Sequence, residues 1–200
     1  MDGHVTVSIV TEVDFPILGT EPLPVEFANT DYGGGAERID FLRSAEQIDR
    51  WFAVVHPPAI EGEMGRAGER VRQLRDGVRH LLSAAADRAA PDPRRLDIVN
   101  EFARAAPTFA QMVWTPDTAP AARRFDIATG APALLGHIAT CSIELLIGPQ
   151  SDALRRCSGP GCSLLFVKNH ARRRWCHPSC GHRDRQARYY RRHHPREVRP

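Results

Sequence analysis

Four cysteines near the end of the chain constrain its fold more than any other feature. They are Cys157, Cys162, Cys176 and Cys180, and their spacing is C-x4-C-x13-C-x3-C. Each close pair can bring two thiolates to one ion from a short turn, called a knuckle below. The longer separation between the pairs lets the two knuckles bind the same ion. Four thiolates predict one structural Zn²⁺ in a closed tetrahedral site, which has no open coordination position for a substrate.

Other uses of these cysteines remain open on the sequence alone. His170, His177 or His182 can replace one thiolate, an iron–sulfur cluster also takes four cysteines, and export would allow two disulfides. The first residues, MDGHVTVSIVTEVDFP, have acids within their apolar run and no basic region before it, unlike a signal peptide. We therefore expect a cytoplasmic protein, in which thiols stay reduced and clustered cysteines bind metal.

The basic residues are concentrated at the same end. From Arg155 onward there are thirteen lysines and arginines against two acids, whereas the preceding part has fourteen bases and twenty-two acids. The two parts therefore carry formal charges of +11 and −8, which sum to the +3 of the chain. This asymmetry indicates two units with different partners, or a basic tail that folds back on an acidic body. A module so rich in arginine has little apolar surface, so metal binding supplies much of its folding energy.

Hydrophobic periodicity predicts a mostly helical body with a few strands, which is an α+β fold. Residues 5–9 alternate as a strand does, and residues 23–30 are compatible with a strand or a helix. Helical patterns are expected over 44–55, where Ser44 and Gln47 have capping-box spacing, and over 66–90, 96–103 and 134–145. MVWT and RRFDI on either side of TPDTAPAA predict a β-hairpin. The boundary is expected near Gly148–Asp152, between a domain over 1–152 and a zinc module over 153–200.

The body offers little sign of catalysis. Its histidines, His4, His56, His80 and His137, are scattered and lack a recognisable motif. Cys141 lies on an apolar helical stripe, which favours a small buried side chain over a reactive thiol. The aromatic residues Tyr32, Trp51, Phe52 and Trp114 are predicted to fill the core rather than line a ligand pocket. We therefore expect a protein that is not an enzyme, and no stretch of the sequence has the uninterrupted apolar length of a membrane helix.

The basic tail predicts contact with nucleic acid. A helix is expected over 180–194, and Arg185, Arg188 and Arg192 fall on one of its faces. Arginine binds phosphate with two parallel hydrogen bonds and also reads guanine in the major groove. The predicted contacts are Arg172, Arg173, Arg174, Arg183, Arg185, Arg188, Arg191 and Arg192.

Two other interpretations fit the same residues. One is a solvated charged helix, and the other is a zinc-stabilised module that binds a protein partner. Of Tyr189 and Tyr190, at least one is expected to pack against the knuckles. The oligomeric state cannot be read from the sequence, because no heptad or interface stripe is evident.

The stretch RRWCHPSCGHR, residues 173–183, resembles the signature of the CGNR zinc-finger family, with His182 where the family usually has Asn. LPVEFANT, residues 23–30, is similar to the N-terminal pattern of the ABATE domain that accompanies this finger. The resemblance implies a transcription regulator whose zinc module binds double-stranded DNA and whose N-terminal domain senses stress or an unidentified small-molecule effector. Within LPVEFANT, we interpret Glu26, Asn29 and Thr30 as capping a turn or a helix rather than touching a ligand.

Overall fold

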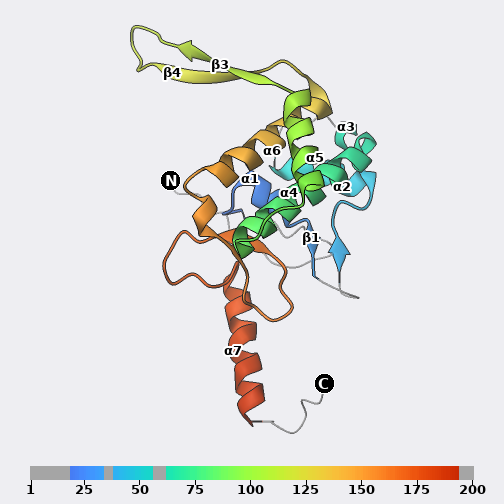
Figure 1. Cartoon of the computed structure of the whole chain (residues 1–200), viewed down its shortest axis with the longest axis vertical. Coiled ribbons are helices and arrows are strands. Elements are labelled where there is room, and N and C mark those ends of the chain that lie inside the picture. The colour runs from blue at the N-terminus through green and yellow to red at the C-terminus, as the bar shows by residue number, and fades with distance from the viewer. Residues whose placement is uncertain (1–18, 34–37, 56–61, 194–200) are drawn as a thin grey trace, which may run out of the picture.

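The computed structural model describes residues 19–33, 38–55 and 62–193 (Figure 1). Over these residues it is a mostly helical body with short strand pairs, from which one long helix extends at the C-terminal end. The predicted α+β class is confirmed. The strand expected over 5–9 lies outside the described residues.

The described helices and strands are α1 (Leu23–Ala28), β1 (Asp31–Tyr32), β2 (Ile39–Asp40), α2 (Ala45–Val55), α3 (Glu63–Arg66), α4 (Gly68–Asp87), α5 (Pro93–Ala105), β3 (Thr108–Val113), β4 (Ala121–Asp126), α6 (Gly130–Ile147), β5 (Leu154–Arg156), β6 (Leu165–Val167) and α7 (Pro178–His193). The predicted helices and hairpin occur in the expected order, and the structure adds α3 and the short strand pairs β1–β2 and β5–β6. Within the described part, the strands pair as β1–β2, β3–β4 and β5–β6, all antiparallel. The ambiguous segment 23–30 begins with a helix, and a proline in its first turn fits because the first amides of a helix have no intrahelical partner.

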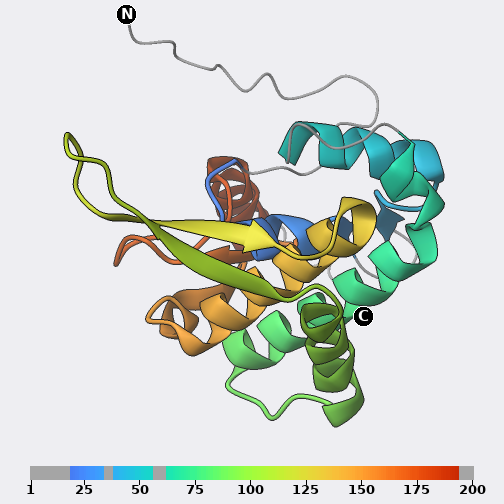
Figure 2. The same ribbon diagram turned by 90° about the horizontal axis from the view of Figure 1, so that it is seen from above.

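Helix α4 lies at the centre of the body, with α1, α5 and α6 packed around it (Figure 2). Its predicted stripe is buried, including Val71, Leu74 and Val78. Trp51 and Phe52 of α2 are also buried and contact Phe27 of α1, with the Phe27 and Trp51 ring centroids 5.4 Å apart. The expected core positions of Trp51 and Phe52 are therefore confirmed.

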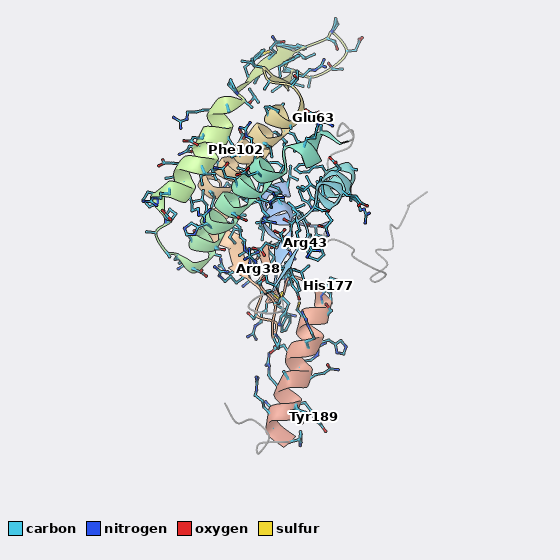
Figure 3. All side chains as sticks on the ribbon, turned by 90° about the vertical axis from the view of Figure 1, so that its right-hand side faces the viewer. Arg38, Arg43, Glu63, Phe102, His177 and Tyr189 are labelled. Atoms are coloured by element: carbon cyan, nitrogen blue, oxygen red, sulfur yellow. The ribbon has the colours of Figure 1, made fainter. Side chains whose placement is uncertain are left out.

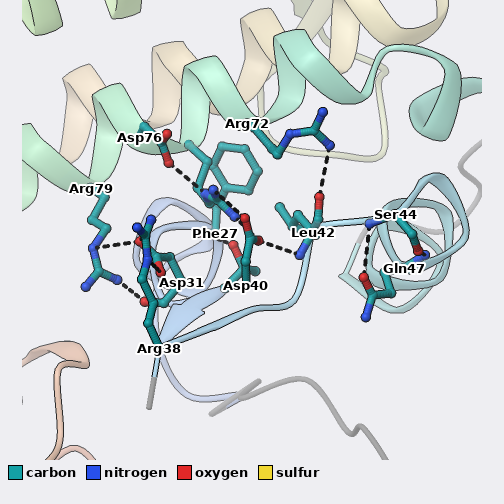
Figure 4. Close-up of polar contacts among 12 residues, drawn as sticks. Phe27, Asp31, Arg38, Asp40, Leu42, Ser44, Gln47, Arg72, Asp76 and Arg79 are labelled. Atoms are coloured by element: carbon teal, nitrogen blue, oxygen red, sulfur yellow. Dashed lines mark hydrogen bonds and ion pairs between the residues drawn. The ribbon is translucent and has the colours of Figure 1, made fainter. Parts of the chain in front are cut away.

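Polar contacts attach the short strands β1 and β2 to α4 (Figure 4). Arg75 of α4 is only 2% exposed and forms an ion pair with Asp40 of β2. Burial raises the pKa of Asp40, but the hydrogen bonds from Arg75 and from the Leu42 amide outweigh it, so the net pKa is lowered. Next along the chain, the amides of Ser44 and Gln47 donate reciprocally to each other's side chains at 3.0 and 3.2 Å, which confirms the predicted capping box.

Helix α6 is long and apolar enough to cross a membrane by length and composition, alone among the described helices. One of its faces belongs to the core, with Leu135 and Ile138 almost fully buried. Cys141, on the same helix, is half-buried, with its Sγ 3.6 Å from Nε2 of His137. The thiol is therefore less enclosed than the apolar stripe predicted.

The β3–β4 hairpin extends away from the helices (Figures 1 and 2). Its register pairs Thr108 with Asp126 and Val113 with Ala121, which confirms the predicted hairpin. Trp114, at the end of β3, is 67% exposed, so the prediction that it fills the core was wrong. The indole has no core to enter there, because the hairpin leaves the body before reaching it.

Candidate metal centre and basic helix

The four cysteines come from two knuckles. Cys157 follows β5, and its amide donates to the Leu164 carbonyl at 2.9 Å, so the β5–β6 pairing continues up to the first ligand. The turn between Cys157 and Cys162 closes through the Cys162 amide, which donates to the Gly159 carbonyl at 3.1 Å. Gly159 is required there, because a Cβ would lie 2.8 Å from the Cβ of Cys180. Cys180 itself sits in the first turn of α7.

The thiol geometry fits a single metal ion. All four Sγ atoms lie within 4.8 Å of one another, and Cys176 Sγ is 3.7 Å from Cys162 Sγ and 3.6 Å from Cys180 Sγ. Zinc–sulfur bonds of about 2.3 Å in a tetrahedron place thiolates about 3.8 Å apart, in agreement with these values. A disulfide needs about 2.05 Å between sulfurs, so the disulfide alternative does not fit. The four cysteines form a structural zinc site.

The nearby histidines stand outside this ligand set, which among the described residues contains only cysteines. The Nδ1 atom of His170 accepts from the Arg172 amide at 3.1 Å, and that of His177 accepts from the Ser179 amide at 3.2 Å. His182 is exposed on α7. The alternative in which a histidine replaces a cysteine therefore has no support in the geometry.

The electrostatics of the cluster call for a cation. Hydrogen bonds from the Cys162 and Cys176 thiols lower the pKa of Cys157 to about 2. The same closeness to Cys157 raises the pKa of Cys162 to about 12 and also raises that of Cys176. Further ionisation of the cluster is therefore favoured by a bound positive charge. Three donors offset the thiolate charge: the amides of Gly159 and Cys176 at Cys157 Sγ, and Arg183 Nη2 at 3.1 Å from Cys180 Sγ.

Strand β6 separates the zinc site from the core of the body. Leu164 and Phe166 pack against the cysteines, together with Trp175. Leu165 and Val167 alternate with them and belong to the core of the body. Leu165 therefore belongs to the core of the body and not to the small apolar core around the zinc site. An uninterrupted apolar run in a strand is typical of burial on both faces, so LLFV carried the signal for this packing.

Comparison with protein families follows the same division. Residues 21–149 match the ABATE family, described as "Putative stress-induced transcription regulator". The chain belongs to this family. Residues 153–193 match the CGNR zinc finger, so the resemblance seen in the sequence is confirmed. Neither is a family of enzymes. A search of curated proteins found no match.

The ABATE domain holds the CGNR finger through its own sequence motif. Asn29, at the C-terminal end of α1, is fully buried. Its Nδ2 donates to the Leu165 carbonyl at 3.0 Å, and its Oδ1 accepts from the Leu165 amide at 2.9 Å. The Asn29 side chain therefore pairs with the backbone of β6 in the way that a neighbouring strand would. As the sequence suggested, Asn29 is also the C-cap residue of α1, and its amide donates to the Val25 carbonyl at 3.0 Å. The Thr30 hydroxyl donates to the Phe27 carbonyl at 2.7 Å.

A second link uses an arginine that the sequence assigned to nucleic acid. Arg173 donates to Glu21 of the ABATE domain at 2.5 Å, and the Glu21 side chain is fully buried. The Arg173 guanidinium also donates to the carbonyls of Val167 and Cys176, and it lies 4.8 Å above the Phe166 ring. Arg173 therefore stabilises the junction between the two parts.

The other predicted arginines lie at the surface of the finger. Arg183 differs from the rest, because its hydrogen bonds with Cys180 and then Tyr32 raise its pKa above the ordinary value. Arg183 is nevertheless exposed, as are Arg172, Arg174, Arg185, Arg188, Arg191 and Arg192. Tyr189 and Tyr190 are 64% and 48% exposed, so the expectation that one packs against the knuckles was wrong. In Figure 3, α7 carries its side chains into solvent from near His177 to beyond Tyr189.

Proposed function

We propose that this protein is a cytoplasmic transcription regulator that binds double-stranded DNA through α7 and the loop before it. The observation that carries the proposal is a long helix that starts at the zinc site, leaves the acidic body and exposes its arginines (Figure 1). A helix fixed at one end and lined with arginine suits the major groove.

Beyond Arg183, the arginines of α7 form no ion pair with the rest of the described protein. Arg185, Arg191 and Arg192 make no ion pair within the described residues, and Arg188 pairs only with Asp184 on the same helix. Arg185, Arg188 and Arg192 are spaced by three and four residues, so they share one face. Self-repulsion among these charges opposes folding, and a polyanion relieves it through phosphate contacts and counterion release.

The basic residues that fold back on the body are different ones. Arg156 pairs with Asp87 at 2.7 Å, and Arg173 pairs with Glu21. The alternative of a tail that docks on its own body thus describes β5, β6, the second knuckle and the start of α7 at Arg183, but not the rest of α7. For the interface we retain the exposed arginines of α7 with Arg172 and Arg174, and we leave out Arg173 and Arg183, whose guanidinium groups have partners inside the protein.

The effector of the ABATE domain belongs to the same proposal. A groove of about 370 Å³ lies between the start of α1 and the end of α6, and its lining includes Leu23 and Leu145. Pro22, in the same lining, follows Glu21, which holds Arg173 of the finger. A small apolar effector in this groove would act on the finger by favouring one arrangement of this junction over another.

Binding to random-sequence duplex DNA over a salt series tests the proposal. The variant Arg185→Ala/Arg188→Ala/Arg192→Ala is expected to bind more weakly than the unaltered protein, with a salt slope smaller by about 3, or about 1 per lost phosphate contact. The control Arg94→Ala/Arg95→Ala/Arg104→Ala removes the same charge from α5 and should bind like the unaltered protein.

Zinc content and circular dichroism must match across the three proteins. Equal DNA affinity of the α7 variant would remove this helix from the interface. No binding by the zinc-loaded protein at low salt would instead favour an acidic protein partner, the other interpretation of the basic tail.

A further inference from the structure

The β3–β4 hairpin and its flanks group several of the exposed large apolar residues of the described structure. Its exposed large apolar residues are Phe109, Met112, Val113, Trp114 and, just after β4, Ile127. The strands contact each other and do not pack extensively on another described element. An isolated two-stranded hairpin is marginally stable in water, and contiguous exposed apolar surface is typical of protein interaction sites. This hairpin therefore has the properties of an interaction surface.

The two edges of the hairpin are not equivalent. Strand β4 carries Arg123 and Arg124 and starts one residue after Pro120, and charge and proline both discourage further strand pairing. Strand β3 has the sequence TFAQMV, without charge or proline. Among the described strands, only β4 pairs with β3, so the outer edge of β3 has no strand partner there. The next strand in this sheet is thus expected on the β3 side.

We infer that β3 pairs antiparallel with β3 of a second copy of this chain, which makes a four-stranded sheet about a two-fold axis. Charge favours this occupant. Self-pairing joins two uncharged strands and leaves the arginines of both β4 strands on the outer edges, as far apart as the sheet allows. A chain with a formal net charge of +3 gains from an interface that keeps its like charges apart.

The side chains also match under this symmetry. A two-fold axis at Gln111 places Phe109 of one copy opposite Val113 of the other, on the same face of the sheet. Phe109 already stacks on its cross-strand neighbour Phe125, with ring centroids 5.7 Å apart. The four-stranded sheet therefore extends an existing apolar row across the axis, with aromatic and β-branched residues in contact.

The position of the hairpin leaves the finger accessible. The hairpin and α7 lie at opposite ends of the molecule in Figures 1 and 3. Pairing through β3 would thus produce an extended dimer with a basic helix at each far end. The inference does not depend on whether α7 binds DNA, and the two properties can be lost separately.

The test is the oligomeric state of the full zinc-loaded protein, measured by sedimentation equilibrium over a range of concentrations. Met112 and Ala122 are cross-strand neighbours, so Met112→Lys and Ala122→Lys add the same charge to the two different edges. We expect a dimer for the unaltered protein and for Ala122→Lys. For Met112→Lys, we expect a dimer dissociation constant raised by at least about tenfold, which corresponds to about 1.4 kcal/mol.

Gln111→Lys provides a second variant, because it places two like charges on the proposed axis. Zinc content and the thermal midpoint should be unchanged in all three variants, since β3 does not contribute to the buried core. A monomer at every concentration of the unaltered protein would overturn the inference. So would a dimer that Met112→Lys and Gln111→Lys leave intact, or one that Ala122→Lys weakens equally.

Discussion

Helix α7 and the β3–β4 hairpin both stand out from the body, yet they differ in what holds them and in what they expose. The first turn of α7 contributes a zinc ligand, and Gly181 lies against Trp175, where a Cβ would be 3.1 Å from the ring. The hairpin is closed at its base by the Ile127 amide, which donates to the Pro107 carbonyl at 3.3 Å. One projection is held by metal and the other by its own strand pairing.

Their surfaces differ as much as their anchors. The exposed side of α7 is mainly arginine, whereas the exposed side chains of β3 are apolar or uncharged. Exposed charge is favourable in water and is drawn to polyanions, whereas exposed apolar surface is unfavourable until another apolar surface covers it. The comparison teaches that two equally prominent elements can serve different partners, and that the chemistry of the exposed side chains distinguishes them.

Loss of the metal is expected to give the largest difference between the two projections, because it should abolish the function of α7 and spare the hairpin. Cys176→Ser removes a ligand whose Sγ is within 3.7 Å of two others. Structural zinc contributes about 10–16 kcal/mol of binding free energy in zinc-finger peptides, so we expect loss of the finger fold and of DNA binding. The hairpin dimer should remain, because β3 and β4 are distant from the site.

Metal analysis, DNA binding and sedimentation of this variant check the expectation. Cys141→Ser serves as control, since Cys141 is on α6 and should leave the zinc content at one ion per chain. A full complement of zinc in Cys176→Ser would contradict the assigned ligand set. Loss of the dimer together with the metal would show that the two projections are not independent.

Two adjacent arginines sharpen the distinction between structural and exposed charge. Arg173→Ala leaves the fully buried Glu21 carboxylate with the Val167 amide but no charged partner, and breaking such a pair costs about 3–5 kcal/mol of unfolding free energy. Arg174 is exposed and lies 5.7 Å from the Trp175 ring, so Arg174→Ala should change stability little and weaken DNA binding. Urea unfolding and DNA titration of both variants measure the two effects, and equal stabilities would contradict the structural role of Arg173.

A comparable effect is expected at the second contact between the ABATE domain and the finger, which Asn29 makes. Asn29→Ala leaves the Leu165 amide and carbonyl without their side-chain partners in a buried position, at about 1–3 kcal/mol for each unpaired group. Asn29→Asp keeps the acceptor for the Leu165 amide but loses the donor to the Leu165 carbonyl. Chemical unfolding measures the loss, with Asn100→Ala on α5 as control. Stability equal to that of the unaltered protein would show that the junction does not depend on Asn29.

Local patterns account for what could be predicted from the sequence. The zinc ligands follow from their spacing, the start of α2 follows from Ser44 and Gln47, and the hairpin follows from two apolar runs around a turn. Each of these features depends on residues that are close in the chain. Ligand spacing, capping and turn formation are therefore readable without knowledge of the tertiary structure.

Long-range contacts account for what could not be predicted. Asn29 and Leu165 are 136 residues apart, and Arg173 is 152 residues from Glu21. Three arginines in a row have identical propensities, so only the folded structure distinguishes Arg173 from its two neighbours. The exposure of Trp114 was missed because burial tendencies assume that an aromatic residue has a core within reach. That assumption holds for Trp51, and it fails for a hairpin that leaves the body.

The last test compares the two tryptophans Trp51 and Trp114. The smallest change in the free energy of unfolding is expected for Trp114, next to the hairpin strand β3. Trp51 is fully buried among Phe27 and Phe52, so Trp51→Ala should lower the free energy of unfolding by about 3–5 kcal/mol. Trp114 is 67% exposed, and Trp114→Ala should change it by less than about 0.5 kcal/mol at concentrations where the protein is monomeric. Urea unfolding at low and high protein concentration measures both. A large loss for Trp114→Ala in the monomer would mean that the hairpin supports the body fold, whereas a loss confined to high concentration would place the indole in the dimer interface.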